Sequence, residues 1–229
     1  MIFNQGENES PLHFEDLTIG YRKGRREVVV ASGLSATLER GKLTCLLGRN
    51  GTGKSTLLRT LAGLQPPLNQ SPSPHLDGVR GDVALVLTER PDLRNLTAEE
   101  VVDLGRTPHT NFWGTLREDD RRIVAESLQL VGIETLANRP FETLSDGGQQ
   151  KVMIAKALAQ QTPMIFLDEP TAFLDFISRR ELFTLLKRLA HDHGKAILLT
   201  THDLALAEEF ADTTWLLDDG ERQISRPQK

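Results

Sequence analysis

The 229-residue sequence contains a single cysteine, Cys45, and no excess of positive charge. One cysteine cannot form a disulfide within the chain, which excludes a disulfide-stapled fold and is typical of a reducing compartment. Lysine and arginine number 27 against 32 aspartates and glutamates, so the net charge is −5 at pH 7. No net positive field therefore draws the chain to nucleic acid or anionic lipid.

Long hydrophobic stretches are also missing. Apolar runs such as 83–87 and 196–199 are far shorter than the roughly 20 residues that a helix needs to cross a bilayer. Residues 1–11 show neither the basic start nor the apolar run of a secretory signal. We therefore expect any membrane role to come through a partner. With 38% hydrophobic and 26% charged residues, the composition is that of one or at most two globular domains.

The order of the expected elements indicates an α/β fold with an antiparallel beginning. Segments of alternating or β-branched residues predict three antiparallel strands, at 12–19, 27–30 and 34–38. Continuous apolar runs predict buried parallel strands at 43–47, 83–87, 164–167, 196–200 and 213–217. Helical patterns, the first of which directly follows the strand 43–47, occupy residues 55–62, 151–159, 177–191 and 204–210.

Between residues 90 and 141 no buried strand is expected. Apolar residues at helical spacing predict helices at 98–104 and 119–131, so we expect an inserted helical lobe over 90–160. The proline-rich stretch 65–81 predicts a surface loop or an edge hairpin.

Residues 48–55 match the phosphate-binding pattern G-x-x-x-x-G-K-[ST], between a predicted strand and a predicted helix. Glycines allow backbone N–H groups to converge on phosphate oxygens, and the helix start adds its positive dipole end. Lys54 is expected to neutralise the β- and γ-phosphates of a nucleotide, and the Ser55 hydroxyl to bind Mg²⁺. The alternative is a glycine turn without a ligand. The expected nucleotide-binding residues of this loop are Gly48, Asn50, Gly51, Gly53, Lys54, Ser55 and Thr56.

Two carboxylates follow directly after the apolar run 164–167. An acid at the carboxyl end of a parallel strand can hold Mg²⁺ opposite Ser55, and the next acid can polarise the attacking water. We assign Asp168 to the metal and Glu169 to the general base. The alternative is that Asp-Glu-Pro merely ends a strand and turns the chain.

Three further motifs follow in a fixed order. Residues 144–149 read Leu-Ser-Asp-Gly-Gly-Gln and lead into a helical run, Leu174-Asp175 follows the acidic strand end, and Thr201-His202-Asp203 follows a buried strand. With the phosphate loop, these motifs make the chain resemble the nucleotide-binding subunit of an ABC transporter over essentially its whole length. The resemblance implies a single ABC ATPase domain, 1–229, with a RecA-like P-loop NTPase core, an antiparallel β subdomain and an inserted helical subdomain.

The resemblance also implies roles for residues outside the phosphate loop. His202 would be the switch histidine of the catalytic site, and Tyr21 would stack on adenine. Ser145 and Gly147, at a helix N-terminus, would complete the nucleotide site of a second chain. The family therefore implies a head-to-tail homodimer with two shared ATP sites. In isolation, Tyr21 and His202 are more often a sheet-surface tyrosine and a strand-end histidine.

Two positions depart from the family pattern. Asp146 stands where the family has its first signature glycine, and Gly148 where it has glutamine. An acid at position 146 either lies near the γ-phosphate and weakens the closure of the shared site, or points away from the phosphate. Glu89, after the strand 83–87, takes the place of a glutamine that touches Mg²⁺ and senses the permease. We therefore expect Glu89 to act as a metal ligand, with a solvated strand-end glutamate as the alternative.

Residues 104–109 and 171–175 are most similar to ATPases of importers for iron-siderophores, haem or cobalamin. This similarity implies an ATPase that powers import of a metal chelate, at the cytoplasmic face of the inner membrane. Its partners would be two permease subunits and, indirectly, a substrate-binding protein, with no nucleic acid. The alternatives are an importer ATPase for another small cargo such as zinc or manganese, and a soluble ABC-type ATPase acting on nucleic acid. A small P-loop kinase is disfavoured because it needs neither the 145–147 motif nor His202.

Large apolar side chains in a glycine-flanked loop are unexpected on a free surface. Phe112 and Trp113 lie in such a loop, where they are expected either to dock a permease or to pack inside the helical lobe.

Overall fold

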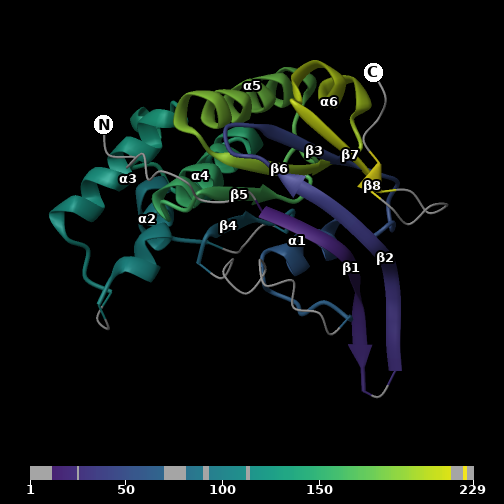
Figure 1. Cartoon of the computed structure of the whole chain (residues 1–229). Coiled ribbons are helices and arrows are strands. Elements are labelled where there is room, and N and C mark those ends of the chain that lie inside the picture. The colour runs from purple at the N-terminus through teal and green to yellow at the C-terminus, as the bar shows by residue number, and fades with distance from the viewer. Residues whose placement is uncertain are drawn as a thin grey trace.

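The computed structural model describes residues 12–24, 26–69, 81–89, 93–111, 114–217 and 224–225. A six-stranded sheet with strand order β4-β5-β6-β3-β7-β8 forms its centre, with helices on both faces (Figure 1). All strand pairs of this sheet are parallel except β7 with β8. Its strands are β3 (Leu43–Leu47), β4 (Val83–Val86), β5 (Met164–Leu167), β6 (Ala196–Thr201), β7 (Thr213–Leu217) and β8 (Ile224–Ser225).

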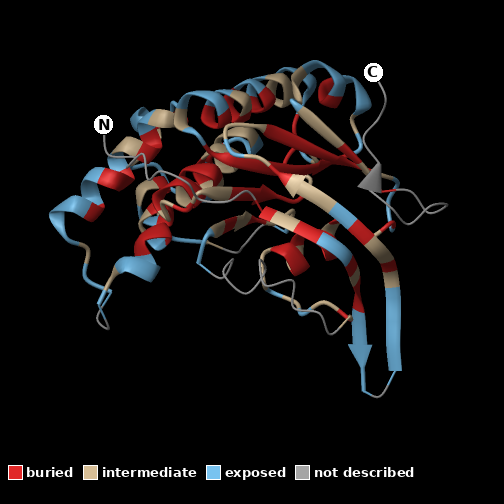
Figure 2. Cartoon of the chain, in the orientation of Figure 1, coloured by how far each residue is buried: buried red, intermediate tan, exposed pale blue. Residues whose placement is uncertain are grey.

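The central strands are buried on both faces, as their continuous apolar runs predict. Every residue of β3 and β6 is buried, and these two strands pair with each other (Figure 2). Alternate side chains enter two separate cores: Cys45 packs in one and Leu46 in the other. Burial raises the pKa of the Cys45 thiol to about 12, so this cysteine is an unreactive part of the core.

The two faces of the sheet carry different elements. One core contains side chains from α1 (Lys54–Leu61) and from a two-stranded antiparallel sheet. The other contains side chains from α5 (Phe176–His193) and α6 (Leu204–Phe210), and from the helices that lie between β4 and β5. Trp215 and Phe14 meet edge-to-face in the first core, with ring centroids 5.9 Å apart. This contact joins the antiparallel strands to the central sheet.

The antiparallel beginning consists of two long strands, so the prediction of three short ones is wrong. They are β1 (Leu12–Lys23) and β2 (Arg26–Leu38). The predicted break at 31–33 instead lies inside β2, because the pairing with β1 continues through register shifts that absorb the irregularity. Gly33 takes a φ of +69° within this strand, a conformation that glycine adopts without strain.

Between β4 and β5 the regular elements of the described residues are helices, joined by turns and irregular segments. These are α2 (Ala98–Asp103), η1 (Leu104–His109), α3 (Glu118–Leu130), η2 (Glu134–Leu136), η3 (Phe141–Thr143) and α4 (Asp146–Ala159). We call α2 to α4 the helical segment. Phe112 and Trp113 lie outside the described residues, as do residues 70–80 of the predicted loop 65–81.

A buried ion pair holds the helical segment together. The guanidinium of Arg106, on η1, lies 2.9 Å from Oδ1 of Asp120, on α3. It also donates to the backbone oxygen of Ala159 at the end of α4, at 2.7 Å, and to the Gln161 side chain at 2.9 Å. Both charged side chains are almost fully buried. One arginine therefore ties the end of α4 to two neighbouring helices.

Candidate nucleotide site

The carboxyl ends of β3, β6 and β5 are neighbours in the sheet, and the predicted site residues follow directly after them. The phosphate loop follows β3, Asp168 and Glu169 follow β5, and His202 follows β6. The carboxyl ends of parallel strands all lie at the same edge of their sheet, and ligands bind at this edge in open α/β sheets. The topology therefore brings together groups that are more than 100 residues apart in the sequence.

The phosphate loop turns sharply from β3 into α1. Gly53 stands at the start of α1 with a φ of +105°, in the left-handed region that favours glycine. A Cβ at this position would lie only 2.4 Å from Cγ1 of Val30, on β2. Both the backbone conformation and the close packing therefore require glycine here. The loop shares an open pocket with the antiparallel sheet, lined by Tyr21, Val30, Asn50, Gly51, Gly53, Lys54, Ser55, Thr56 and Glu169.

Lys54 is buried beneath this loop, with only 5% of its surface exposed. Its ammonium donates to the backbone oxygens of Gly48 and Arg49, at 2.8 and 3.0 Å. Oε1 of Glu169 lies 3.8 Å from the same nitrogen. A cation held at this depth by two carbonyls and one carboxylate is a fixed positive charge beneath the loop.

Ser55 and Asp168 are in direct contact. The Ser55 hydroxyl donates to Oδ1 of Asp168 at 2.9 Å. The Thr200 hydroxyl, from β6, donates to the same oxygen at 2.9 Å, and the Thr88 hydroxyl donates to the backbone oxygen of Asp168 at 2.7 Å. The carboxylate is thus held by hydroxyls from two separate segments, and a hydroxyl from a third segment holds the backbone of the same residue. A serine hydroxyl and a carboxylate oxygen at this distance are the hard oxygen ligands that Mg²⁺ prefers.

Glu169 has a backbone conformation that is unusual for a residue other than glycine. Its φ is +44°, and its N–H donates to the Thr200 hydroxyl at 2.7 Å. Non-glycine residues in this region cluster at active sites, where the surrounding structure fixes them. Oε2 of Glu169 lies 3.7 Å from Nδ1 of His202. The predicted general base therefore stands between Lys54 and His202, one on each of its carboxylate oxygens.

Tyr21 reaches the same pocket from β1. Its phenol oxygen lies 2.7 Å from Oγ1 of Thr56, on α1. The ring remains 47% exposed, so it presents a surface at the mouth of the pocket. The structure thus brings the predicted base-stacking residue next to the phosphate loop.

Glu89 has a different partner from the other predicted metal ligands. Its side chain is 82% exposed, and its carboxylate lies 3.7 Å from the guanidinium of Arg59, on α1. Ser55 and Asp168 are in contact with each other, whereas Glu89 pairs with a cation. Its role as a metal ligand stays a prediction.

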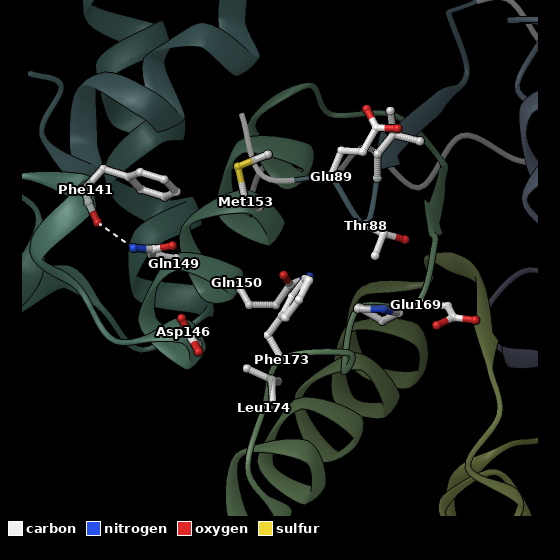
Figure 3. Close-up of a pocket in the computed structure, with 12 residues that line it drawn as sticks. Thr88, Glu89, Phe141, Asp146, Gln149, Gln150, Met153, Glu169, Phe173 and Leu174 are labelled. Atoms are coloured by element: carbon white, nitrogen blue, oxygen red, sulfur yellow. Dashed lines mark hydrogen bonds between the residues drawn. The ribbon is translucent and has the colours of Figure 1, made fainter. Parts of the chain in front are cut away.

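Ser145 and Gly147 open α4, away from the phosphate loop. The Ser145 hydroxyl accepts from the backbone N–H of Gly148 at 3.2 Å and caps the helix. The next residue, Asp146, borders a different hollow, between α4 and the sheet edge. In Figure 3, Asp146 lies on one side of this hollow and Glu169 on the other, with Gln150 and Phe173 drawn between them. Within one chain the signature and the phosphate loop therefore do not share a pocket.

Two hydroxyl residues at the site carry no role in the sequence analysis. Thr200 and Thr88 fix the Asp168–Glu169 segment, and each stands at or just after the end of a buried strand. Polar residues at such positions were the signal that could have identified them. The observed donors fit a magnesium nucleotide: a glycine-rich cradle, a buried ammonium, and a hydroxyl–carboxylate pair.

A mostly parallel α/β sheet with this loop defines a P-loop nucleotide-binding protein. The family profile described as ABC transporter matches residues 31–172, more than half of the sequence. The chain belongs to the ABC transporter ATP-binding family, and its fold is that of an ABC ATPase.

The relatives of this chain include three that are at least 34% identical to it over the aligned residues. The iron(3+)-hydroxamate import ATP-binding protein of Bacillus subtilis is 38% identical, covering 87% of this chain and 76% of that protein. The ferric enterobactin transport ATP-binding protein of Escherichia coli is 34% identical, covering 93% of this chain and 80% of that protein. The aliphatic sulfonates import ATP-binding protein of Pseudomonas putida is 38% identical, covering 88% of this chain and 72% of that protein.

Two solved structures are also similar. A metal-chelate type ABC transporter in an inward-facing conformation superposes with a TM-score of 0.82 at 27% identity, covering 96% of this chain and 84% of that one. A dimeric bacterial ABC transporter cassette superposes with a TM-score of 0.75 at 28% identity, covering 93% of this chain and 96% of that one.

Proposed function

We propose that this chain hydrolyses ATP to power import of a metal chelate, such as an iron-siderophore, haem or cobalamin, through a membrane permease. The observation that carries the hydrolytic part is the joint placement of Lys54, Ser55, Asp168 and Glu169 at one sheet edge. The siderophore relatives and the metal-chelate transporter structure support the cargo class. The sulfonate relative at comparable identity favours, as the second candidate, an importer ATPase for another small cargo.

The site residues divide the chemistry among them. Ser55 and Asp168 would hold a magnesium ion, which supplies positive charge beside the β- and γ-phosphates. Lys54 neutralises the same phosphates, and Glu169 accepts the proton of the water that attacks the γ-phosphorus. As the new P–O bond forms, the bond to the bridging oxygen breaks, giving ADP and phosphate. His202 positions the Glu169 carboxylate from its other side.

The partners follow from the separation between the signature and the phosphate loop. Ser145 and Gly147 of one chain would complete the site of a second chain, so the working unit is a head-to-tail homodimer. The dimeric cassette supports this assembly. Two permease subunits would bind the dimer at the cytoplasmic face of the inner membrane, with a substrate-binding protein acting through them and no nucleic acid involved. No helix in the described part of the chain is long and apolar enough to span a bilayer.

The first test is hydrolysis by the purified chain. We expect release of phosphate from ATP in Mg²⁺ and none in excess EDTA. Hydrolysis that is unchanged in EDTA would contradict the proposed metal site.

The second test concerns the cargo. The chain is expressed with a candidate permease, purified with it, and reconstituted with the binding protein. ATP hydrolysis that rises with a loaded iron-siderophore binding protein supports the metal-chelate assignment, whereas stimulation by a sulfonate-loaded one supports the second candidate.

A further inference from the structure

The hydroxyl of Thr56 is engaged by a tyrosine. The sequence places Thr56 among the nucleotide-binding residues of the phosphate loop. In the structure its Oγ1 lies 2.7 Å from the phenol oxygen of Tyr21, a short hydrogen bond in which either oxygen can donate. Thr56 is 5% exposed, so water competes little for this bond.

The strand that carries Tyr21 is fixed to the segment that follows α1. The Gln65 side chain donates to the backbone oxygen of Gly20, the residue before Tyr21. Farther along, the backbone N–H of Leu68 donates to the Thr18 oxygen at 2.9 Å, and Arg22 donates to the Leu68 oxygen at 3.3 Å. The backbone on both sides of Tyr21 is therefore anchored, while its ring depends on Thr56 for a polar contact.

The ring and the phosphate loop belong to one pocket. Both Tyr21 and Thr56 line it together with Lys54 and Ser55. A hydrogen bond at the far end of the phenol fixes the ring relative to α1, while the ring face stays available because the residue is 47% exposed. An aromatic side chain that is already ordered loses less conformational entropy when a base stacks on it.

We infer that the Tyr21–Thr56 hydrogen bond fixes the tyrosine ring in the orientation that receives the nucleotide base. Thr56 is then a positioning residue for the base. This inference rests on the proposed ATP-binding function, and it deepens that function by linking the base end of the site to the phosphate loop.

A ligand-free measurement tests the bond itself. Tyr21 is the sole tyrosine of the sequence, so protein labelled with ¹³Cζ-tyrosine gives one tyrosine signal. Thr56→Val should shift that signal and broaden it, because the phenol loses its partner. Thr60→Val is the matched control: this threonine is buried on the same helix and its hydroxyl donates to the Thr56 backbone oxygen, at 2.8 Å. The control should leave the signal nearly unchanged.

Binding measurements test the role of the bond. Thr56→Val and Tyr21→Phe should each weaken ATP binding about two- to tenfold, the range expected for one hydrogen bond. The double variant should be no weaker than either single one, because all three lack the same bond. Inorganic tripolyphosphate has no base, so its affinity should stay the same in all variants and in Thr60→Val.

The opposing outcomes are distinct. Equal losses of ATP and tripolyphosphate affinity in Thr56→Val would make Thr56 a phosphate ligand and overturn the inference. Unchanged ATP affinity in both single variants would overturn it as well. If the wild-type chain bound neither ATP nor tripolyphosphate, the proposed function would fail. The role of the hydrogen bond in base binding would fail with it, even if the tyrosine signal showed that the bond forms.

Discussion

The edge of the central sheet and the beginning of α4 form two halves of one proposed site, and one chain assembles only the first. At the sheet edge, side chains that follow three different strands contact one another directly, as Ser55 contacts Asp168 at 2.9 Å. At the beginning of α4, Ser145 caps its own helix, and the next residue, Asp146, borders a different hollow from the pocket of the phosphate loop. The sheet edge therefore holds the proposed hydrolytic groups by itself, whereas in the proposed dimer the helix start would reach the corresponding groups of another chain.

The two regions are also stabilised differently. Hydroxyl groups of Thr200 and Thr88 hold the acidic strand end against its neighbours. The far end of α4 is held by the buried pair of Arg106 and Asp120. Because no described contact of this pair reaches the phosphate loop, damage to one region should leave the other intact.

The largest expected effects are at the sheet edge. Lys54→Ala should abolish ATP binding, because it removes the fixed cation beneath the phosphate loop. Glu169→Gln should bind ATP but lose hydrolysis by about 100- to 10,000-fold, the range for a general base, and should accumulate as an ATP-bound dimer. Nucleotide titration, phosphate release and size-exclusion chromatography measure these differences. Hydrolysis by Glu169→Gln at the wild-type rate would refute the assignment of the base.

The next effect is on stability and is confined to the helical segment. Asp120→Asn should lower the free energy of unfolding by about 3 kcal/mol, because it leaves the Arg106 charge buried without its partner. ATP affinity of the folded variant should be unchanged. Asp119→Asn is the control, because that neighbouring carboxylate pairs with Arg122 at the surface and should cost less than about 0.5 kcal/mol. Similar losses in the two variants would contradict this account of the segment.

The same pair predicts a pH dependence. The backbone N–H of Arg117 and the Arg106 guanidinium lower the pKa of Asp120 from its ordinary value. A carboxyl group whose pKa is lower in the folded chain stabilises the fold above its ordinary pKa, near 3.9. That stabilisation is lost as the pH falls through the lowered value. The difference in acid stability between the wild type and Asp120→Asn should therefore begin to shrink near pH 4 and vanish only below the lowered pKa of Asp120.

Much of the sheet edge was predictable from the sequence. The strands 43–47, 164–167 and 213–217 have the bounds that their apolar runs predict, because buried strands leave a continuous pattern. The phosphate loop and Asp168 lie at the ends of such strands, so the topology alone brings them together. The spacing of the phosphate loop then indicates which atoms face the ligand.

Other features depend on contacts that no local pattern encodes. The helix α4 begins at Asp146, five residues before the helical pattern 151–159, because the Ser145 cap carries the helix through two glycines that are unfavourable in helices. Only the family resemblance, which implies a helix N-terminus at Ser145 and Gly147, indicated this earlier start. The pairing of Glu89 with Arg59 joins two segments 30 residues apart. The hydroxyls of Thr56 and Thr200 find partners that only the assembled fold supplies.

A smaller effect is expected at the beginning of α4. Ser145→Ala removes a helix cap and should lower the free energy of unfolding by about 1 kcal/mol. Ser145→Gly is the control, because glycine at this position costs only a few tenths of a kcal/mol. Both variants should bind ATP normally and hydrolyse it about tenfold more slowly, because the hydroxyl is missing from the partner's site.

Mixing experiments test whether the two regions meet across a dimer. A dimer of one Lys54→Ala chain and one Ser145→Ala chain has both defects in one site and leaves the other site intact. Mixing the two variants should therefore restore part of the activity that each lacks alone. Activity of the mixture no higher than the mean of the two variants would argue against shared sites.

The smallest effect is expected at Glu89, at the border between the two regions. Its pair with Arg59 is largely exposed, so the ion pair is expected to contribute little to stability. A divalent cation attracts a carboxylate more strongly than an amide does, so Mg²⁺ at Ser55 and Asp168 would compete with Arg59 for Glu89. Glu89→Gln should then raise the Mg²⁺ concentration for half-maximal hydrolysis about two- to threefold, with ATP binding in EDTA nearly unchanged.

Arg59→Gln supplies the opposing variant. Without the guanidinium, Glu89 loses the cation that holds it away from the metal, so the Mg²⁺ requirement should fall where Glu89→Gln makes it rise. Opposite shifts in the two variants would show that the metal and Arg59 compete for one carboxylate. If neither variant changed the Mg²⁺ requirement, with or without a permease, Glu89 would be excluded from the metal site. Its role would then be limited to the surface pair with α1, and the sheet edge would hold the metal with Ser55 and Asp168 alone.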